Sequence, residues 1–120
     1  MIYGSQVELD AALVVWQGRL RLRDWDVRAE FVSPRELEES RGRISVSIAL
    51  KEAFIRIAKK GPDADWDVYA NDHEQILVHE LLHIPLEAFF PEDRDSLEYR
   101  MAEQAVNSIS KALVAGYRGG

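Results

Sequence analysis

Cysteine is absent from the 120 residues of this chain. Its absence excludes disulfides, thiolate nucleophiles and cysteine-rich zinc sites, and it fits a reducing compartment such as the cytoplasm, where we expect the protein to act. Any metal ion must therefore be held by histidine and carboxylate side chains.

A long apolar run and a secretory leader are also lacking. No stretch approaches the roughly 20 apolar residues that a membrane-spanning helix needs. Residues 1–5 carry no basic segment ahead of an apolar core, and Glu8 and Asp10 interrupt the only candidate stretch. We therefore expect a soluble protein with no signal peptide and no membrane partner.

Basic residues are fewer than acidic residues. Fifteen Lys and Arg stand against 21 Asp and Glu, which gives a formal net charge of -6. A nucleic-acid partner is not expected, because binding one requires cations that neutralise phosphates. The acidic residues are spread along the chain, as on an ordinary solvated surface, and indicate no substrate preference.

The apolar residues that are present, 47% of the chain, suffice for the core of one domain spanning residues 1–120. Leu9, Leu13, Trp16 and Leu20 recur at helical spacing and predict a packing helix near the N-terminus. Alternation of apolar and polar residues then predicts strands at these positions: 25–31, 44–50 and 53–57.

The second half of the chain has helical signals. After a predicted surface loop up to residue 71, Asp72 and Gln75 have the spacing of a capping box and predict the start of a helix. Pro85 should end or kink this helix near Ile84, because proline lacks the backbone donor and clashes with the preceding turn. A last helix is expected over about residues 94–115.

This order of elements predicts an α+β fold. It consists of an N-terminal helix, a small, largely antiparallel three-stranded sheet, and two further helices packed with the first on one face of the sheet.

The predicted helix after Asp72 carries the pentapeptide His79-Glu80-Leu81-Leu82-His83. Two imidazoles four residues apart lie one turn apart on one face, where both can reach a zinc ion at about 2.0 Å. Glu80 can accept a proton from metal-bound water, whose pKa zinc lowers toward about 7. A chance match on an ordinary helix is the alternative, but the cap, the preceding strands and the later carboxylates favour metal binding.

The remaining histidine and several aromatic residues are predicted to have structural roles. His73, six residues before His79, points to another side of the helix and is expected on the surface. Several aromatic residues are expected in the core, although they could line a substrate groove. They are Trp16, Trp25, Trp66, Phe89 and Phe90.

Two segments together resemble a known family. Residues 76–83 (Ile-Leu-Val-His-Glu-Leu-Leu-His) and 103–110 (Glu-Gln-Ala-Val-Asn-Ser-Ile-Ser) are similar to the small zincin metallopeptidases of the gluzincin kind, found often in phages and mobile elements. The resemblance covers the C-terminal part of the chain and, in the N-terminal half, only the order of elements. It implies a minimal zincin-like fold and peptide hydrolysis. It also implies that His79, His83 and Glu103 are the zinc ligands and that Glu80 is the general base. Pro85 departs from the family's apolar continuation.

The third ligand has two candidates on the last helix. Glu98 projects into the middle of a predicted core stripe, where an unpaired carboxylate is costly and a metal would relieve it. Glu103 fits the family pattern and has Asn107 one turn later as a hydrogen-bonding partner, so we choose Glu103. Tyr99 is a candidate oxyanion donor. The predicted core stripe consists of Leu97, Met101, Ala105, Ile109 and Ala112.

Two functions follow from the sequence. The first is a zinc-dependent endopeptidase that binds a peptide or protein substrate, extended along an edge strand of the sheet. The second is a non-catalytic, zinc-binding structural or regulatory protein, for example one encoded by a phage. An open fourth coordination position would favour the enzyme, and a closed one the alternative.

Overall fold

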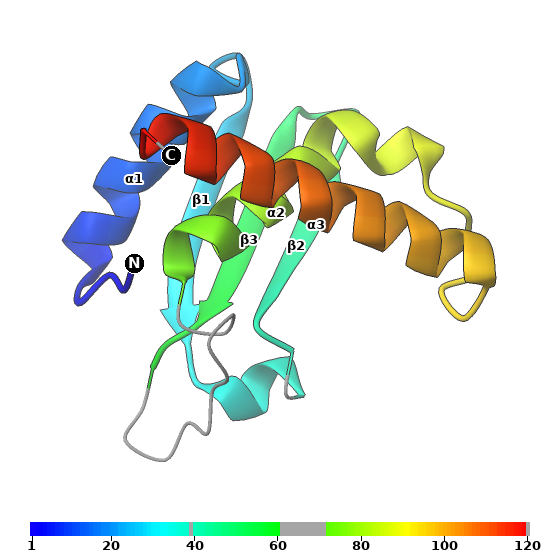
Figure 1. Ribbon diagram of the computed structural model, residues 1–120, viewed down its shortest axis with the longest axis horizontal. Coiled ribbons are helices and arrows are strands. Elements are labelled where there is room, and N and C mark those ends of the chain that lie inside the picture. Colours follow the sequence, from blue (N-terminus) through cyan, green and yellow to red (C-terminus); the bar gives the residue numbers. More distant parts are fainter. Residues whose placement is uncertain (39, 61–71, 120) are drawn as a thin grey trace.

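The structure, a computed structural model, describes residues 1–38, 40–60 and 72–119. Over these residues it contains three α-helices and a three-stranded sheet, which confirms the α+β fold with its N-terminal and C-terminal helices (Figure 1). In chain order the elements are α1 (Gln6–Arg19), β1 (Asp26–Val32), the 3-10 helix η1 (Pro34–Leu37), β2 (Gly42–Ser47), β3 (Glu52–Ala58), α2 (His73–Leu86), the 3-10 helix η3 (Glu87–Phe89) and α3 (Leu97–Tyr117).

The sheet is mixed, with the strand order β1-β3-β2. β3 occupies the centre, where Ala53 lies opposite Val46 of the antiparallel strand β2 and opposite Val27 of the parallel strand β1. The expected antiparallel pairing is thus confirmed for β2 with β3, whereas β1 is parallel to β3. The alternation of apolar residues is the same for both senses, so the sequence pattern does not distinguish them.

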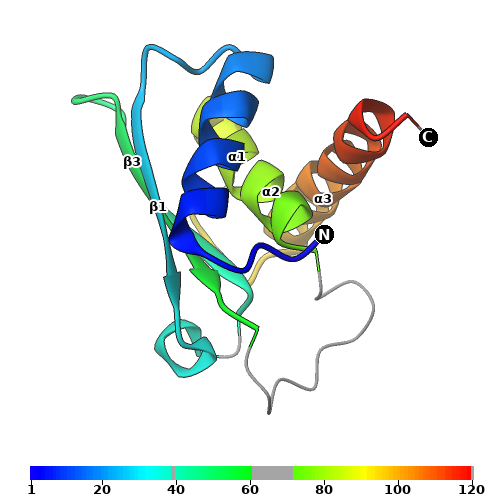
Figure 2. The same ribbon diagram turned by 90° about the vertical axis from the view of Figure 1, so that its left-hand side faces the viewer.

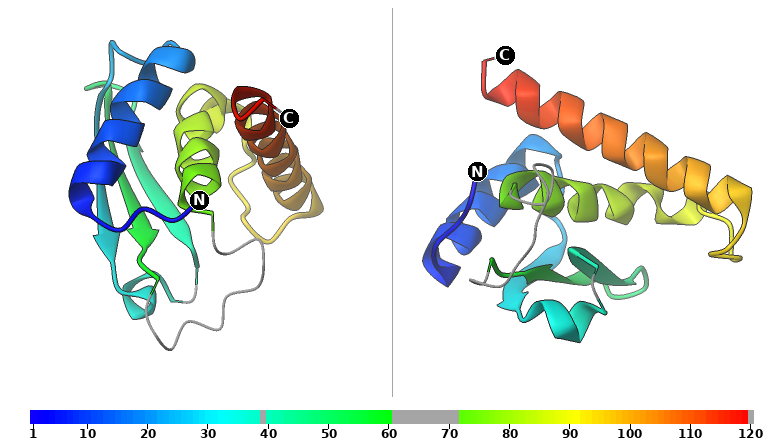
Figure 3. Two further views of the ribbon diagram at one scale, coloured as in Figure 1. Left: turned by 60° about the vertical axis from the view of Figure 1, so that its left-hand side comes forward. Right: turned by 60° about the horizontal axis from the view of Figure 1, so that its bottom comes forward.

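The helices form two layers on one face of the sheet. α1 packs against β1, and α2 packs against β2 and β3, as Figure 2 shows. α3 lies on α2 on the side away from the sheet (Figure 3). α2 is therefore enclosed between the sheet and α3, which explains why it is apolar on both sides.

The core lies between the sheet and the first helical layer. Leu9 and Trp16 of α1 meet Ile55 of β3 and Leu77 of α2 in one buried cluster. Ser5 begins α1, because its Oγ accepts a hydrogen bond from the Glu8 N–H at 3.2 Å. The helical stripe predicted from the sequence is the buried face of α1.

Both signals that delimit α2 act as predicted, with a shift of two residues at its end. Asp72 is the N-cap, and its Oδ1 accepts a hydrogen bond from the Gln75 N–H at 3.1 Å. Pro85 lies in the last turn and the helix ends at Leu86, two residues beyond Ile84. Pro85 cannot donate a backbone hydrogen bond to the carbonyl of Leu81, and α2 ends one residue later, where the chain changes to η3.

α3 faces α2 with a different side from the one predicted. Val106, Ser110 and Val114 are its buried residues. The predicted core stripe lies at the surface, with exposed fractions of 61% for Leu97 and 60% for Met101. α3 has apolar residues on two sides, and the side that meets α2 is the one that also carries Glu103.

Other expectations are corrected at the ends of elements. β2 stops at Ser47, and Ile48 and Leu50 lie exposed in the turn before β3. α3 begins after Ser96, whose Oγ accepts a hydrogen bond from the Tyr99 N–H.

The expected surface loop over 61–71, with its Trp66, lies outside the described residues. In the described ranges, no helix is both long and apolar enough to cross a bilayer.

Candidate metal centre

Three side chains from two helices converge between α2 and α3. Nε2 of His79 lies 3.2 Å from Oε2 of Glu103, and Nε2 of His83 lies 2.9 Å from Oε1 of the same carboxylate. The potential ligand atoms of the three residues all lie within 4.8 Å of one another. The structure thus brings together the three residues that the sequence analysis singled out as ligands.

The donor set fits one zinc ion. Ligand atoms around a tetrahedral zinc with bonds of about 2.0 Å stand roughly 3.3 Å apart. The distances from the two imidazoles to the Glu103 oxygens are close to this value, and all ligand atoms of the group lie within 4.8 Å of one another. Two histidines and one carboxylate leave a fourth position, which is the arrangement of catalytic rather than structural zinc sites.

The alternative ligand Glu98 lies elsewhere. Its side chain is exposed at the start of α3, and it is not part of the cluster that His79 and His83 form with Glu103. The argument for Glu98 depended on the predicted core stripe, which is exposed. The geometry therefore favours Glu103.

The electrostatics of the cluster are those of one carboxylate paired with two imidazoles. Hydrogen bonds from His79 and His83 hold the pKa of Glu103 down to about 2. Burial alone would lower the pKa of His83, but the carboxylates of Glu103, Glu80 and Glu87 outweigh it and raise that pKa. A carboxylate that stays ionised beside two imidazoles is ready to share a cation with them.

Glu80 lies beside the cluster and is buried, with 7% of the residue exposed. Burial raises its pKa, although His79 and His83 counteract this effect. A carboxylate with a raised pKa accepts and releases a proton more readily near neutral pH than an exposed one. Its environment is therefore suited to the general base that the sequence predicts.

Gly42, at the start of β2, allows the strand to approach Glu80 closely. A Cβ atom on Gly42 would lie 2.7 Å from Cγ2 of Ile76 and 3.3 Å from Oε1 of Glu80. A larger residue would have to displace α2 or the Glu80 side chain. This contact of Gly42 with α2 depends on tertiary packing and is not visible in the sequence.

Glu87 is a second residue that the sequence analysis missed. Its Oε2 lies 3.4 Å from Nδ1 of His83, on the opposite side of the ring from Glu103. With a metal bound, Nε2 of His83 would lose its proton and its lone pair would face the ion, while a proton on Nδ1 would be directed to Glu87. The spacing of four residues between His83 and Glu87 is the signal that could have identified this contact.

Two aromatic residues border the cluster at the end near His83. The Phe90 ring centroid lies 4.8 Å from that of His83 and 5.2 Å from that of Tyr99, which it meets edge to face. Burial, followed by the charge of Glu103, raises the pKa of Tyr99, so its hydroxyl keeps its proton at neutral pH. The role of Tyr99 as oxyanion donor stays a prediction. Phe89, by contrast, is 80% exposed.

A cleft of about 550 Å³ opens beside the cluster. At one end its walls include His79, Glu80 and Glu103, and Asn107 lines it one turn further along α3. No hydrogen bond from the Asn107 side chain to Glu103 is found among the described residues, so the predicted support of that ligand stays a prediction. The cleft thus reaches His79 and Glu103 of the cluster and the carboxylate of Glu80.

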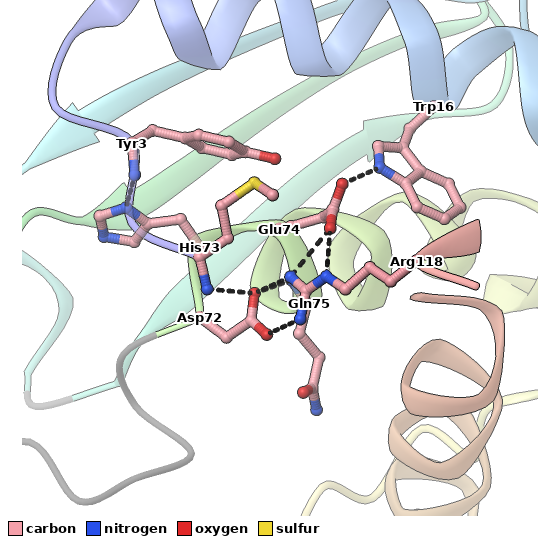
Figure 4. A network of polar contacts seen from close by, with 8 residues as sticks. Tyr3, Trp16, Asp72, His73, Glu74, Gln75 and Arg118 are labelled. Carbon is pink, nitrogen blue, oxygen red and sulfur yellow. Dashed lines mark hydrogen bonds and ion pairs between the residues drawn. The ribbon is translucent and has the colours of Figure 1, made fainter. Parts of the chain in front are cut away.

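The start of α2 is tied to the end of α3 by charged hydrogen bonds (Figure 4). The Arg118 guanidinium donates to both carboxylate oxygens of Asp72 at 2.9 Å and, through Nε, to Glu74 at 2.9 Å. Trp16 of α1 donates to the other oxygen of Glu74 at 3.0 Å. These contacts fix the two helices that carry the candidate ligands relative to each other.

His73 belongs to the same region and corrects the expectation of a surface residue. It is only 1% exposed, and its Nδ1 accepts a hydrogen bond from the Tyr3 N–H at 2.9 Å (Figure 4). The His73 ring also packs on Phe31. The N-terminal segment covers this side of α2, which the helical position of His73 alone does not reveal.

Comparison with known proteins does not place the chain in a family. No family model, no curated protein and no solved structure matches it. The resemblance to small zincins therefore stays an expectation from residues 76–83 and 103–110.

Proposed function

We propose that the protein is a zinc-dependent metallopeptidase. The observation that carries the proposal is the convergence of His79, His83 and Glu103 next to the buried carboxylate of Glu80, at the end of an open cleft. When bound, zinc supplies a Lewis acid that polarises the scissile carbonyl and acidifies a water molecule. The absence of cysteine is consistent with action in the cytoplasm, which we include in the proposal.

The side chains around the metal would carry out the other steps of the reaction. Glu80 accepts a proton from the attacking water and passes it to the leaving amine, a role that its raised pKa favours. Glu87 would orient His83, and Tyr99 would donate a hydrogen bond from its hydroxyl to the developing oxyanion.

The substrate would be an extended peptide. β2 is an edge strand of the sheet, and Arg41 and Gly42 at its start form part of the cleft wall opposite α2. A peptide lying along this strand gains backbone hydrogen bonds independent of sequence. Its scissile bond would then pass the cluster on α2.

The alternative is a zinc-binding structural or regulatory protein without activity. The cleft argues against it, because a structural zinc site is closed by a fourth protein ligand. Within the described residues, the cluster contains only three candidate ligands. An enzyme needs the remaining position for water and substrate.

The test combines metal analysis with a search for peptide hydrolysis. Protein purified without chelator should contain one zinc per chain and cleave members of a quenched-fluorescence peptide library. Chelation should abolish cleavage and added zinc should restore it. The matched variant Glu80→Gln should keep its zinc and lose cleavage, because the amide preserves size but cannot accept the proton.

The outcomes separate the two functions. Zinc binding with no hydrolysis of any library peptide would favour the non-catalytic protein. Hydrolysis by Glu80→Gln at the parent rate would remove Glu80 from the mechanism.

A further inference from the structure

The side of α1 that faces away from the core is apolar. The buried residues of this helix are Leu9, Leu13 and Trp16. Residues spaced by three or four positions form the opposite side, the outer face of α1, which consists of Val7, Ala11, Val14 and Gly18. α1 lies at the left edge of Figure 1 and nearest the viewer in Figure 2, and neither α2 nor α3 covers its outer face.

Valine is an unfavourable residue at exposed positions of a helix. Val7 is 76% exposed and Val14 is 63% exposed. Because a branched side chain loses rotamer freedom in a helix, both valines lower the helix propensity of α1 without gaining burial in return. Packing against a second surface would remove both side chains from water and offset this cost.

A shallow hollow extends this apolar surface toward the N-terminal segment. Its volume is about 410 Å³, and Ala11 of the outer face is one of its lining residues. Met1, Ile2 and Val15 line it as well, and all three are exposed. The outer face and the hollow therefore form one continuous apolar surface.

The two ends of the outer face have opposite charges. Asp10 lies beside its start, and its Oδ1 accepts a hydrogen bond at 2.7 Å from the amide of Gln6, a neutral donor that does not cancel its charge. Arg23 lies at its end, where Nη2 is 2.5 Å from the position that a Cβ atom on Gly18 would occupy. Within the described residues, Arg23 makes no ion pair. The surface is therefore acidic at one end and basic at the other.

We propose that two copies of the chain associate through the outer faces of α1, with the two helices antiparallel. A surface with opposite charges at its ends complements an inverted copy of itself, and a two-fold axis produces this inversion. The charge pattern therefore selects a second copy of this chain as the partner. In a parallel pair the like-charged ends would meet and repel each other.

The register follows from the positions on the helix. A two-fold axis between Ala11 and Val14 puts each of these residues opposite the other one in the second copy, so that a small side chain faces a larger one. Val7 then lies near Gly18 of the other copy, and Asp10 comes within reach of the Arg23 guanidinium that covers that glycine. The dimer thus contains two such ion pairs, one at each end of the contact.

The contact is independent of the proposed peptidase. Among the described residues that line the cleft beside the metal cluster, none belongs to α1. Dimerisation therefore leaves the cleft open, and its test needs neither zinc nor a substrate.

Sedimentation velocity over a concentration series from about 1 μM to about 1 mM measures the association. The outer face of the 14-residue helix α1, about 21 Å long and about 10 Å wide, is smaller than the roughly 800 Å² per partner of stable complexes. We therefore expect a reversible monomer–dimer equilibrium with a dissociation constant in the micromolar range. High salt should raise this constant, because the ion pairs lie at the surface.

Exchange of the charges tests the antiparallel arrangement. Asp10→Arg or Arg23→Asp alone places like charges opposite each other at both ends, and each should raise the dissociation constant about tenfold or more. The double variant Asp10→Arg/Arg23→Asp restores opposite charges between the copies and should dimerise like the parent. A folding defect would not be repaired in this way.

Val14→Glu tests the apolar part of the contact. It places a carboxylate without a partner beside Ala11 of the other copy and should prevent dimerisation. The matched control is Met101→Glu, which changes an exposed apolar residue of α3 and should dimerise like the parent. Circular dichroism and the melting temperature would show that both variants fold.

Three results would contradict the proposal. A chain that stays monomeric up to about 1 mM, or a Val14→Glu variant that dimerises like the parent, would overturn it. Dimerisation that is lost in Met101→Glu and kept in Val14→Glu would assign the contact to α3 instead. A double charge variant that associates no better than the single variants would exclude the antiparallel pairing of α1.

Discussion

Oε2 of Glu103 lies 3.2 Å from Nε2 of His79, and this contact joins two helices across 24 residues of sequence. Such a pair depends on how α3 crosses α2, because each residue occupies an ordinary position on its own helix. The contact therefore links the fold to the candidate metal centre, and changes that disturb the helix arrangement should be distinguishable from changes that remove a ligand.

The close approach of β2 to α2 predicts a cost for Gly42→Ala. The added Cβ would lie 2.7 Å from Cγ2 of Ile76, so we expect a loss of about 1–3 kcal/mol in the free energy of unfolding. The added Cβ would also lie 3.3 Å from Oε1 of Glu80 and shift that side chain. We therefore expect the rate of hydrolysis to fall more than the zinc content. Urea unfolding and metal analysis measure the two effects.

Gly116→Ala is the matched control for that change. An added Cβ at Gly116 meets nothing within 4 Å, and the residue lies in the last turn of α3. Alanine should be neutral or stabilising there by up to about 1 kcal/mol, because it has the higher helix propensity. Equal effects of the two substitutions would contradict the proposed strand contact.

The hydrogen bonds of Arg118 predict that Arg118→Gln lowers the free energy of unfolding by about 1–2 kcal/mol, a value reduced for the partial exposure of the arginine. Its partners Asp72 and Glu74 are mostly buried, with 17% and 12% of their side chains exposed. The change leaves both carboxylates without this cation. The exposed Arg100→Gln on the same helix is the control, and it should stay within about 0.5 kcal/mol of the parent. Similar losses in both variants would assign the effect to net charge.

His73 predicts a pH dependence of stability. Burial lowers its pKa below the usual 6.5, although a backbone contact with Ala58 opposes this shift. The unfolded chain then binds a proton below pH 6.5 that the folded protein lacks, so the stabilising contribution is present above that pH and is lost as the pH falls.

The comparison is between the parent and His73→Asn, whose side-chain oxygen can still accept the Tyr3 N–H. With chelator in both samples, urea unfolding from pH 5 to 8 should show the parent gaining stability relative to the variant as the pH rises. A constant difference across this range would mean that His73 keeps an ordinary pKa in the folded protein.

Glu87 predicts an effect on metal affinity without direct coordination. Glu87→Gln removes the carboxylate that lies 3.4 Å from Nδ1 of His83, so we expect zinc affinity to fall by about 10-fold or more. Competition with a fluorescent chelator measures this affinity. Glu92→Gln, an exposed acid in the segment between α2 and α3, should bind zinc as tightly as the parent.

Local signals in the sequence were sufficient to place the helices and two of the three candidate ligands. Asp72 and Gln75 set the start of α2, and the four-residue spacing of His79 and His83 puts both rings on one side of it. These features depend on hydrogen bonds and periodicity within a few residues, which a sequence displays directly.

Features that depend on contacts between distant segments were not predictable. α3 has a more apolar side with Leu97 and Met101, yet it packs through Val106 and its neighbours, and this packing brings Glu103 to the histidines. The burial of His73 likewise depends on Tyr3, 70 residues away. The parallel pairing of β1 with β3 has no counterpart in the alternation of either strand.

The central claim, that His79, His83 and Glu103 bind one zinc ion, is tested most directly by calorimetric zinc titration of metal-free protein. The parent should bind one equivalent, and His79→Ala or His83→Ala should abolish stoichiometric binding. Glu103→Gln should lose most of the affinity, while Glu98→Gln, which changes an exposed residue of the same helix, should match the parent. A large loss in Glu98→Gln alone, or undiminished binding in either histidine variant, would contradict the account.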